Sequence, residues 1–315
     1  MVWAIVLLSV LAAGLGSRSA FALGFAARLE RTLQASYLAA AGVERAAQAL
    51  DEDATPTFDG LNELWVNNEY VFARQPLGDG RYSIVAAAGA GPQRYGLIDE
   101  ERKLNVNTVS SDVVLRLLQR VAGMKPNDAM EAAESLVDWR DEDHEALPHG
   151  AEKFHYLSLS PSYDCKDAPF ENLEELLLVR GVSVEVFDRI RPYVTVHGSG
   201  EVNVNTADAA VLGALGLSPQ GVDELLWYRA GEDGIEATSD DRALASIGAA
   251  PSELGSVLPA EDLHRIARLA EERQVGVGSS AFSVVVEATV LAEPVPARVH
   301  AVIDRKGRVL AWSER

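Results

Sequence analysis

The stretch that decides the fold is MVWAIVLLSVLAAGLGSRSAFALGFAARLERTLQASYLAAAGVERAAQAL, residues 1–50. Its first sixteen residues carry no charge, and Arg18 is the only charged residue before Arg28. A helix needs about 20 apolar residues to cross the hydrocarbon core of a bilayer. Residues 1–27 are therefore long enough to span a membrane, provided that Arg18 extends to the interface or finds a partner.

The second half of this stretch has a different pattern. From Phe25 to Leu50 apolar residues recur at steps of three, four or seven, with charged and amide side chains between them, which is typical of an amphipathic helix. No proline occurs before Pro56. We therefore expect one continuous helix over 1–50, whose apolar half lies in a membrane and whose second half packs on a globular body.

Three interpretations fit an apolar N-terminal segment. A cleaved secretory signal needs a basic region ahead of its apolar core, and none precedes the core here. A signal anchor needs only the apolar length. A pilin-type helix whose short basic leader has been removed accounts for the missing basic region and for the unbroken passage into amphipathic sequence.

The composition excludes one class of partner. The chain has 315 residues, of which 28 are basic and 47 acidic, so its net charge is −19. Nucleic acids select basic surfaces, so nucleic-acid binding is not expected. An acidic body is instead suited to collecting divalent cations. The single cysteine, Cys165, cannot form an internal disulfide and is expected to be a buried thiol.

Strand signals lie at both ends of the chain beyond the first helix. Gly78–Gly80 is a hairpin turn between two strand-like stretches, and a third strand is expected over 93–98. Near the C-terminal end, 304–307 is a second turn. The expected strands cover 70–72, 81–85, 93–98, 282–291, 298–303 and 308–312.

Residues 105–274 carry helical patterns instead, with no comparable run of strand signals. Strands at both ends with helices between them predict an α+β fold, in which one antiparallel sheet is interrupted by an inserted helical block. The expected division of the chain is a helix over 1–50, the first part of the sheet over 51–100, the helical insertion over 101–278, and the last strands over 279–315.

An internal repeat marks this helical block. The sequence KLNVNT (103–108) precedes one helical stretch and EVNVNT (201–206) precedes another. We expect Thr108 and Thr206 to be helix N-caps and Asp112 and Asp208 to lie in first helical turns. The asparagines are expected to bond the backbone at a strand-to-helix turn and not to bind a ligand.

A second pattern, LLLVRGVSVEVFDRIRPYV (176–194), has the form of two short helices around Gly181. Such helix-hairpin-helix units often contact the DNA backbone. The acidic residues around this unit disfavour that role, and packing of small helical units is the preferred interpretation.

The densest acidic segment is DWRDEDHE (138–145), followed by GAE at 150–152. Calcium takes six to eight oxygen ligands, which a flexible acidic loop can supply, although the spacing is not that of an EF-hand. A second acidic loop covers 232–241. A solvated charged loop is the alternative for both. Phosphate-binding loops, nucleophile elbows, HExxH and CxxC motifs are absent from the sequence, and the spacing of its loop histidines is not a zinc template, so no enzyme is expected.

Several spaced motifs together resemble one family. The sequence is similar to the K-type minor pseudopilins of type II secretion in four segments, which are GLIDEERKLNVNT (96–108), SLVDWRDEDHEALPHGAE (135–152), YLSLSPSYDCKDAPFENLEELLLVRGV (156–182) and RPYVTVHGSGEVNVNTADAAVL (191–212). The resemblance implies a pilin-like fold, a long helix and a sheet, with a large helical domain inserted into the sheet.

The resemblance also implies a role and partners. It implies a cap at the tip of a periplasmic pseudopilus, bound to the I- and J-type minor pseudopilins and working with the major pseudopilin and the inner-membrane secretion platform. The protein would cross the inner membrane once and hold its body in the periplasm. Ile5 stands where most pilins carry a glutamate, as expected of a tip subunit with no neighbour above it. The alternative is a minor pilin of a type IV pilus or DNA-uptake system.

Calcium binding in the helical domain is a further implication of the resemblance. The loop at 138–145 is the matching segment, although His149-Gly150 stands where the family more often has Gly-Gly. The expected calcium ligands are Asp138, Asp141, Asp143 and Glu152.

Overall fold

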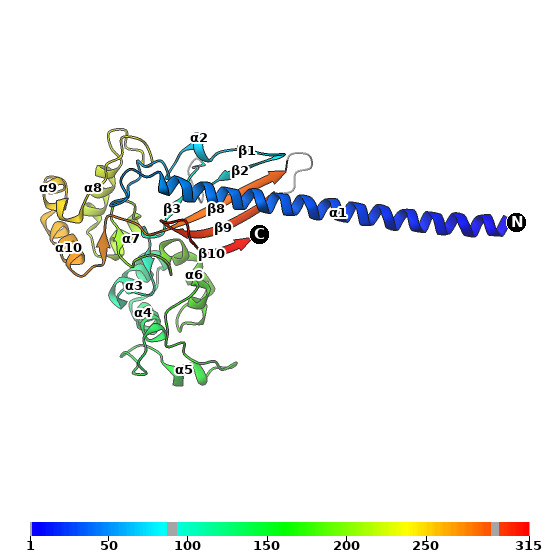
Figure 1. Cartoon of the computed structure of the whole chain (residues 1–315). Helices are drawn as coiled ribbons and strands as arrows, with labels where there is room; N and C mark the ends of the chain where they lie inside the picture. The colour runs from blue at the N-terminus through cyan, green and yellow to red at the C-terminus, as the bar shows by residue number, and fades with distance from the viewer. Residues whose placement is uncertain (1, 87–92, 291–295, 315) are drawn as a thin grey trace.

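The long N-terminal helix is present as expected. The structure is a computed structural model that describes residues 2–86, 93–290 and 296–314. Helix α1 (Val2–Asp51) is unbroken, which confirms the prediction from residue 2 onward; Met1 lies outside the described residues. Its N-terminal half projects from the body (Figure 1). Among the described residues α1 is the one helix long and apolar enough to cross a membrane.

The second half of α1 packs on an antiparallel sheet. The buried positions of α1 begin at Ala35 and end at Leu50, and they lie against apolar residues of the sheet. The helix approaches closely at Gly42, where an added Cβ would lie 2.5 Å from a methyl carbon of Val286. A glycine at this position therefore lets the helix backbone lie directly on the central strand.

The sheet takes strands from both ends of the chain. Its order is β1-β2-β8-β9-β10, and β3 pairs with β8 beside β2. Strand β2 runs antiparallel to β8, with Ile84 opposite Val286. The prediction of one shared sheet is therefore confirmed. The strands are β1 (Gln75–Leu77), β2 (Gly80–Ile84), β3 (Ile98–Asp99), β8 (Ala281–Val290), β9 (Pro296–Asp304) and β10 (Val309–Glu314).

Two expected strands are wrong or much shorter than predicted. The stretch 70–72 lies in a helical turn, α2 (Glu69–Phe72), because the Asn68 side chain accepts the amide N–H of Val71 and caps that turn. The predicted strand 93–98 is reduced to β3, which only begins at Ile98. Phe72 and Leu97 are buried in the core beside the sheet without being part of it, so their hydrophobicity misled the prediction.

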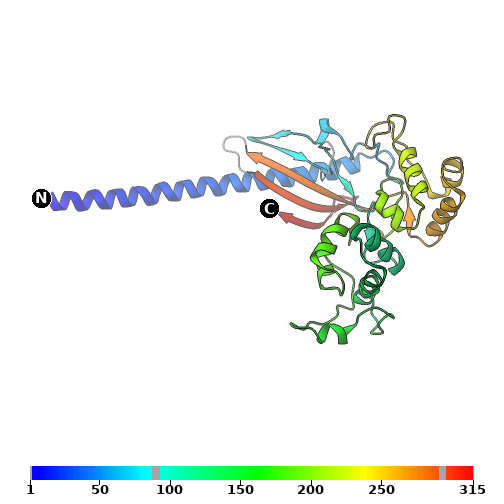
Figure 2. The same ribbon diagram turned by 180° about the vertical axis from the view of Figure 1, so that it is seen from behind.

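Between β3 and β8 the chain forms the helical block, which has a hydrophobic core of its own. The turn at Gly181, with φ +83°, separates two short helices there as the sequence predicted. The block contains α3 (Ser111–Leu117), η1 (Leu118–Ala122), α4 (Pro126–Arg140), α5 (Lys153–Leu157), η2 (Leu173–Leu178), α6 (Val184–Ile190), η3 (Arg191–Tyr193), α7 (Ala209–Ala214), α8 (Pro219–Arg229), η4 (Ile247–Ala249), α9 (Ala250–Glu253) and α10 (Ala260–Glu271). The block lies at the end of α1 remote from the N-terminus (Figure 2).

The helical block is built from two similar units, each closed by a short parallel strand pair. In the first unit β4 (Leu104–Asn105) pairs with β5 (Val194–Thr195). In the second unit β6 (Val202–Asn203) pairs with β7 (Val275–Gly276). Each unit begins with the Asn-Val-Asn-Thr sequence and returns to pair beside it, so the sequence repeat is also a structural repeat.

The asparagines of the repeat bond the backbone, as predicted. Asn107 accepts the N–H of Phe170 and donates to its carbonyl, and Asn205 does the same with Leu244. The predicted threonine caps are wrong: α3 follows Ser110 and α7 follows Asp208. Because the Asn side chains already hold the turn, each helix begins only after a further stretch of chain beyond its threonine.

Candidate metal centre

The candidate metal centre lies in the loop after α4. This helix ends at Arg140, whose guanidinium turns back and donates to the carbonyl oxygens of Val106 and Val109. Arg140 thereby ties the end of α4 to the first Asn-Val-Asn-Thr turn. Because the Arg140 guanidinium donates to these two carbonyls, the carboxylates of the following loop are left to other partners.

Three acidic side chains converge in this loop. One oxygen each from Asp141, Asp143 and Glu152 lies within 4.8 Å of the others, a spacing at which they could hold a metal ion. Glu152 is also grouped in this way with Asp167 and His144. The structure therefore brings together three of the four residues expected from the sequence and adds two others.

Several oxygens of this site have no hydrogen-bond partner in the part of the chain that the structure describes. They are Oε1 of Glu152, Oδ1 of Asp141 and Oδ1 of Asp167. Glu152 is only 6% exposed. A buried oxygen without a partner costs free energy, and a bound cation would remove that cost. The unsatisfied oxygens fit a hard cation such as calcium, which prefers carboxylate ligands.

The pKa shifts of the loop carboxylates also fit a cation site. Burial raises the pKa of Asp141, and the charge of Asp143 adds to this effect. Burial likewise raises the pKa of Glu152. The nearby Lys153 is paired with Asp164 at 2.7 Å and does not neutralise the site. Arg140 lowers the pKa of Asp141 and His144 lowers that of Glu152, but burial and the neighbouring carboxylates outweigh them, so the loop is only partly compensated by its basic residues.

Asp138 lies outside the converging group. Its side chain is fully buried on α4, and both carboxylate oxygens accept the N–H of Leu147 at 3.2 Å. Burial raises the pKa of Asp138 to about 6. A Cβ at residue 150 would lie 1.9 Å from Oδ2 of Asp138, so Gly150 is needed for this approach. Asp138 therefore folds the loop back on α4 and positions it.

Asp167 and His144 were not among the residues expected from the sequence. Nδ1 of His144 lies 3.2 Å from Oδ2 of Asp167. Asp167 has φ +48°, an uncommon conformation for a residue other than glycine. It lies beyond the long connection from α5, and sequence spacing gave no sign that this connection returns to the loop. Cys165 beside it is buried, as expected, and burial raises the pKa of its thiol to about 12.

The second acidic loop is closed by its own hydrogen bonds. Arg229 pairs with Glu236 at 2.6 Å, and Asp240 accepts the N–H groups of Glu232 and Asp233. Asp241 accepts the N–H of Ala237. These carboxylates belong to none of the metal-holding groups found among the described residues.

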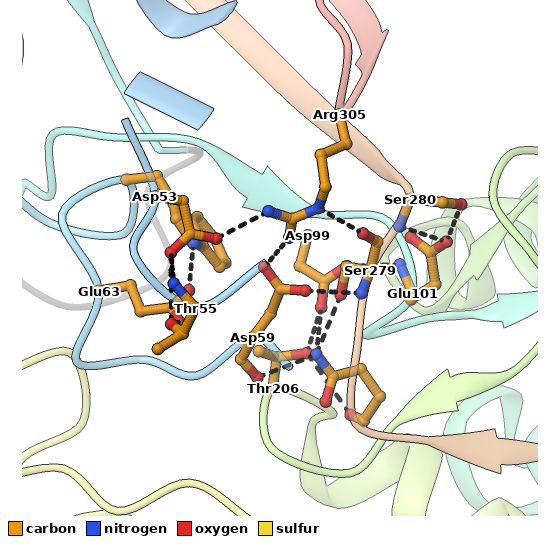
Figure 3. Close-up of polar contacts among 12 residues, drawn as sticks. Asp53, Thr55, Asp59, Glu63, Asp99, Glu101, Thr206, Ser279, Ser280 and Arg305 are labelled. Carbon is orange, nitrogen blue, oxygen red and sulfur yellow. Dashed lines mark hydrogen bonds and ion pairs between the residues drawn. The ribbon is translucent and has the colours of Figure 1, made fainter. Parts of the chain in front are cut away.

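A third acidic group lies where α1, the sheet and the helical block meet. Asp53, Asp59 and Glu63 converge there, and Arg305 donates to both aspartates, at 2.7 Å for Asp53 (Figure 3). Burial raises the pKa of Asp59 to about 7 despite this pairing. Because the arginine already supplies the positive charge, this group is a structural junction.

The same junction extends into the second repeat unit. Asp99 accepts the Thr206 hydroxyl and the side-chain amide of Asn203, and that amide also donates to the Ser279 hydroxyl (Figure 3). Burial raises the pKa of Asp99, and the charge of Glu101 adds to it. The repeat sequence thereby links the helical block to the base of the sheet.

Comparison with known proteins gives consistent results. Residues 91–199 match the family model described as Type II secretion system (T2SS), protein K. The type II secretion system protein K of Klebsiella pneumoniae is 28% identical over 224 residues, 66% of this chain and 66% of the relative. That of Pseudomonas aeruginosa is 28% identical over 246 residues, 75% of this chain and 72% of the relative. The match thus spans about two thirds of the first relative's length.

A solved structure extends the likeness to nearly the whole chain. The chain shares its fold with a chain of the GspK-GspI-GspJ complex from the enterotoxigenic Escherichia coli type 2 secretion system, with a TM-score of 0.67 and 19% sequence identity. The match covers 95% of this chain and 99% of that chain. The resemblance and the α+β, pilin-like fold expected from the sequence are both confirmed.

Proposed function

We propose that the chain, as a member of the type II secretion system protein K family, is a minor pseudopilin. It would cap the tip of the pseudopilus and help to initiate the pseudopilus. The observation that carries it is the arrangement of three parts: an exposed apolar half-helix, a sheet packed on the other half of that helix, and a bulky helical block inserted into the sheet.

The position of the helical block supports a capping role. The block lies at the end of α1 remote from the N-terminus (Figures 1 and 2). In a fibre whose subunits stack their helices in parallel, such a block stands above its own sheet. A further subunit added on top would meet the block and not a free helix, so assembly would end with this chain.

The partners and location belong to the same proposal. The chain would bind the I- and J-type minor pseudopilins, because the solved complex with a chain of the same fold joins GspK to GspI and GspJ. It would then meet the major pseudopilin and the inner-membrane platform. The apolar half of α1, the candidate membrane span, would cross the inner membrane once and leave the body in the periplasm. This role is structural, as expected of a secretion-system component, and needs no catalytic group.

Co-purification tests this function. The full chain in detergent and a version lacking residues 1–27 are each mixed with the I- and J-type minor pseudopilins of the same secretion system. A stoichiometric complex is expected for both, because the body carries the contacts and the removed residues only anchor. Failure of the full chain to bind either partner contradicts the proposal. Aggregation of the shortened chain in a buffer that keeps the full chain soluble contradicts the anchor.

We also propose that the candidate metal centre binds calcium. Asp141, Asp143, Glu152 and Asp167 would be the ligands, with Asp138 positioning the loop. Removing either Glu152 or Asp167 should therefore weaken binding. Calorimetric titration of the full chain with calcium should give one strong site, which is lost in Glu152→Gln and weakened in Asp167→Asn. Unchanged binding in both variants would place the ion elsewhere.

A further inference from the structure

The helical block and the sheet have separate hydrophobic cores. Among the described residues, Ala237 is the one residue of the block that belongs to the core of the sheet. Two chain connections cross between the parts, at 100–103 and at 277–280. A cavity of about 610 Å³ also lies between them, with Leu173 of the block on one side and Val302 of the sheet on the other. The apolar cores therefore do not fix the orientation of the block, and the polar junction between the parts has to do so.

Two buried carboxylates, Asp59 and Asp99, lie at the centre of this junction, and we call them the junction pair (Figure 3). Asp99 accepts the side-chain amide of Asn203 at 3.1 Å and the hydroxyl of Thr206, both in the second unit. Asp59 accepts the N–H of Ser279 at 2.7 Å. The Asn203 amide also donates to the Ser279 hydroxyl and to the backbone carbonyl of Asp59. The junction pair and the start of the second unit therefore form one hydrogen-bonded group.

Negative charge outweighs positive charge around the junction pair. The charged groups that face the pair are Asp53 and Glu63 from the loop after α1, Glu101 from the connection after β3, and Arg305 from the turn between β9 and β10. Arg305 already pairs with Asp53 and Asp59, and Asp99 accepts its hydrogen bonds from neutral groups. Two buried carboxylates that share so little positive charge favour keeping one proton. Burial raises the pKa of Asp59 to about 7, and burial and the charge of Glu101 raise the pKa of Asp99.

Glu100, the residue after Asp99, makes a compensated contact between the same two parts. It is 3% exposed, and it accepts the hydroxyls of Thr195 in the first unit and of Ser283 in the sheet. Lys103 lies 2.6 Å from it. Burial by itself would raise the pKa of Glu100, but the charge of Lys103 and these hydrogen bonds lower it overall. Glu100 therefore stays ionised at neutral pH and keeps the first unit tied to the sheet.

We propose that this junction is a proton-dependent hinge between the sheet and the helical block. While the junction pair keeps one proton, its hydrogen bonds hold the second unit in one orientation. When the second carboxyl group releases its proton to the solvent, two buried charges repel each other, the junction opens, and the block turns about the fixed contact at Glu100. The block lies at the end of α1 remote from the N-terminus, so this movement changes the surface presented there (Figure 1). The hinge does not depend on the proposed function.

Distances between two spin labels, measured in the full chain in detergent, test this hinge. The labels are attached to Arg81→Cys on β2 and Ala267→Cys on α10, both at exposed positions, and the chain without these changes measures any label on the buried Cys165. The pair avoids the first unit, where other carboxylates titrate. From about pH 5 to about pH 8.5 the distance distribution should broaden at least about twofold, because the second unit is released. A parent distribution that does not change with pH overturns the inference.

Neutral variants of the junction pair provide the matched test. Asp99→Asn and Asp59→Asn each leave only one carboxyl group in the pair, so two charges never meet, and the distribution should stay narrow at both pH values. Glu232→Gln, which removes an exposed acid of the second acidic loop, should broaden as the parent does. Cooperative melting at about pH 5 shows that each variant is folded, and should one fail to fold, the other decides. A folded Asp99→Asn or Asp59→Asn that broadens with pH, or is broad at both values, overturns the inference.

Discussion

The two units of the helical block share one arrangement around their Asn-Val-Asn-Thr turns, but they differ in the acidic loop that follows. In each, a helix ends at an arginine whose guanidinium donates to two carbonyl oxygens at the Asn-Val-Asn-Thr turn: Arg140 in the first unit and Arg229 in the second. An acidic loop follows each arginine. In the first loop buried carboxylate oxygens have no partner within the described part of the chain, and in the second Glu236 pairs with Arg229.

Acidic residues alone therefore do not make an ion site. Hydrogen bonds from the Thr238 hydroxyl and from backbone N–H groups lower the pKa of Asp240 to about 2. In the first loop, burial raises the pKa of Asp141 and Glu152. In the second loop Asp240 and Asp241 accept backbone hydrogen bonds, although burial also raises the pKa of Asp241. In the first loop carboxylate oxygens of Asp141 and Glu152 have no partner among the described residues, and variants at matched positions should separate the two loops.

The largest effect is expected from removing the arginines. Arg229 is 2% exposed and bonds two carbonyls and Glu236, so Arg229→Gln should cost about 3–5 kcal/mol of unfolding free energy by leaving a carboxylate unpaired. Arg140→Gln should cost less, about 1–3 kcal/mol, because it removes two carbonyl hydrogen bonds and no ion pair like that between Arg229 and Glu236. Urea unfolding followed by tryptophan fluorescence measures both. Equal losses would mean that the pairing with Glu236 does not distinguish the units.

Calcium should stabilise the chain through the first loop only. At calcium concentrations about 100 times the dissociation constant, the parent should gain about 2.7 kcal/mol. Asp141→Asn with Asp143→Asn should abolish that gain. Asp233→Asn with Asp240→Asn, the matched change in the second loop, should keep it. Thermal melting with calcium and with a chelator measures this gain in stability. If both double variants lose it equally, calcium does not act through the first loop alone.

The two asparagines of the repeat should differ less than the two arginines in how much unfolding free energy their replacement costs. Asn205 is buried and Asn107 is half-buried, and each exchanges two hydrogen bonds with one backbone residue. Asn205→Ala should cost about 2–3 kcal/mol of unfolding free energy and Asn107→Ala about 1–2 kcal/mol, because water reaches the groups left behind at the half-buried site more easily than at the buried one. Thermal melting of the two variants measures both losses of stability. A larger loss in Asn107→Ala than in Asn205→Ala contradicts this prediction.

A pH dependence should also arise at the junction where α1, the sheet and the second unit meet. Asp59 and Asp99 have raised pKa values in the folded chain, so it holds their protons at a pH where the unfolded chain, with carboxyls near 3.8, has lost them. Stability should therefore fall as pH rises from about 4 to about 7. Asp99→Asn should flatten this slope, and Asn105→Ala should not, because Asn105 donates to the carbonyl of His197 and not to an acid. Melting across that pH range measures the slopes.

Much of the fold could be predicted from local sequence. The long helix followed from an apolar run that passes into an amphipathic pattern without a proline, and β8 and β9 followed from runs of alternating, β-branched residues. The segment 70–72 failed because a capping asparagine at 68 overrode strand-like residues. The threonine caps failed because side-chain bonds from Asn107 and Asn205 fix the turn earlier than the helix begins.

The candidate metal centre was only partly predictable. Asp141, Asp143 and Glu152 are close in sequence, so their convergence needs only one loop. Asp167 comes from a distant connection, and no local pattern reports where such a segment returns. Sequence also could not separate the two acidic loops, because whether a carboxylate is paired depends on a side chain, such as Arg229, placed by packing of the whole unit.

The length of α1 sets the distance between the membrane and the body of the protein. The helix rises about 75 Å over its 50 residues, and the buried positions on the sheet begin only at Ala35. With residues 1–27 as the membrane segment, about seven helical residues remain before Ala35, a rigid spacer about 10 Å long. The body would therefore be held at a fixed, short distance above the lipid.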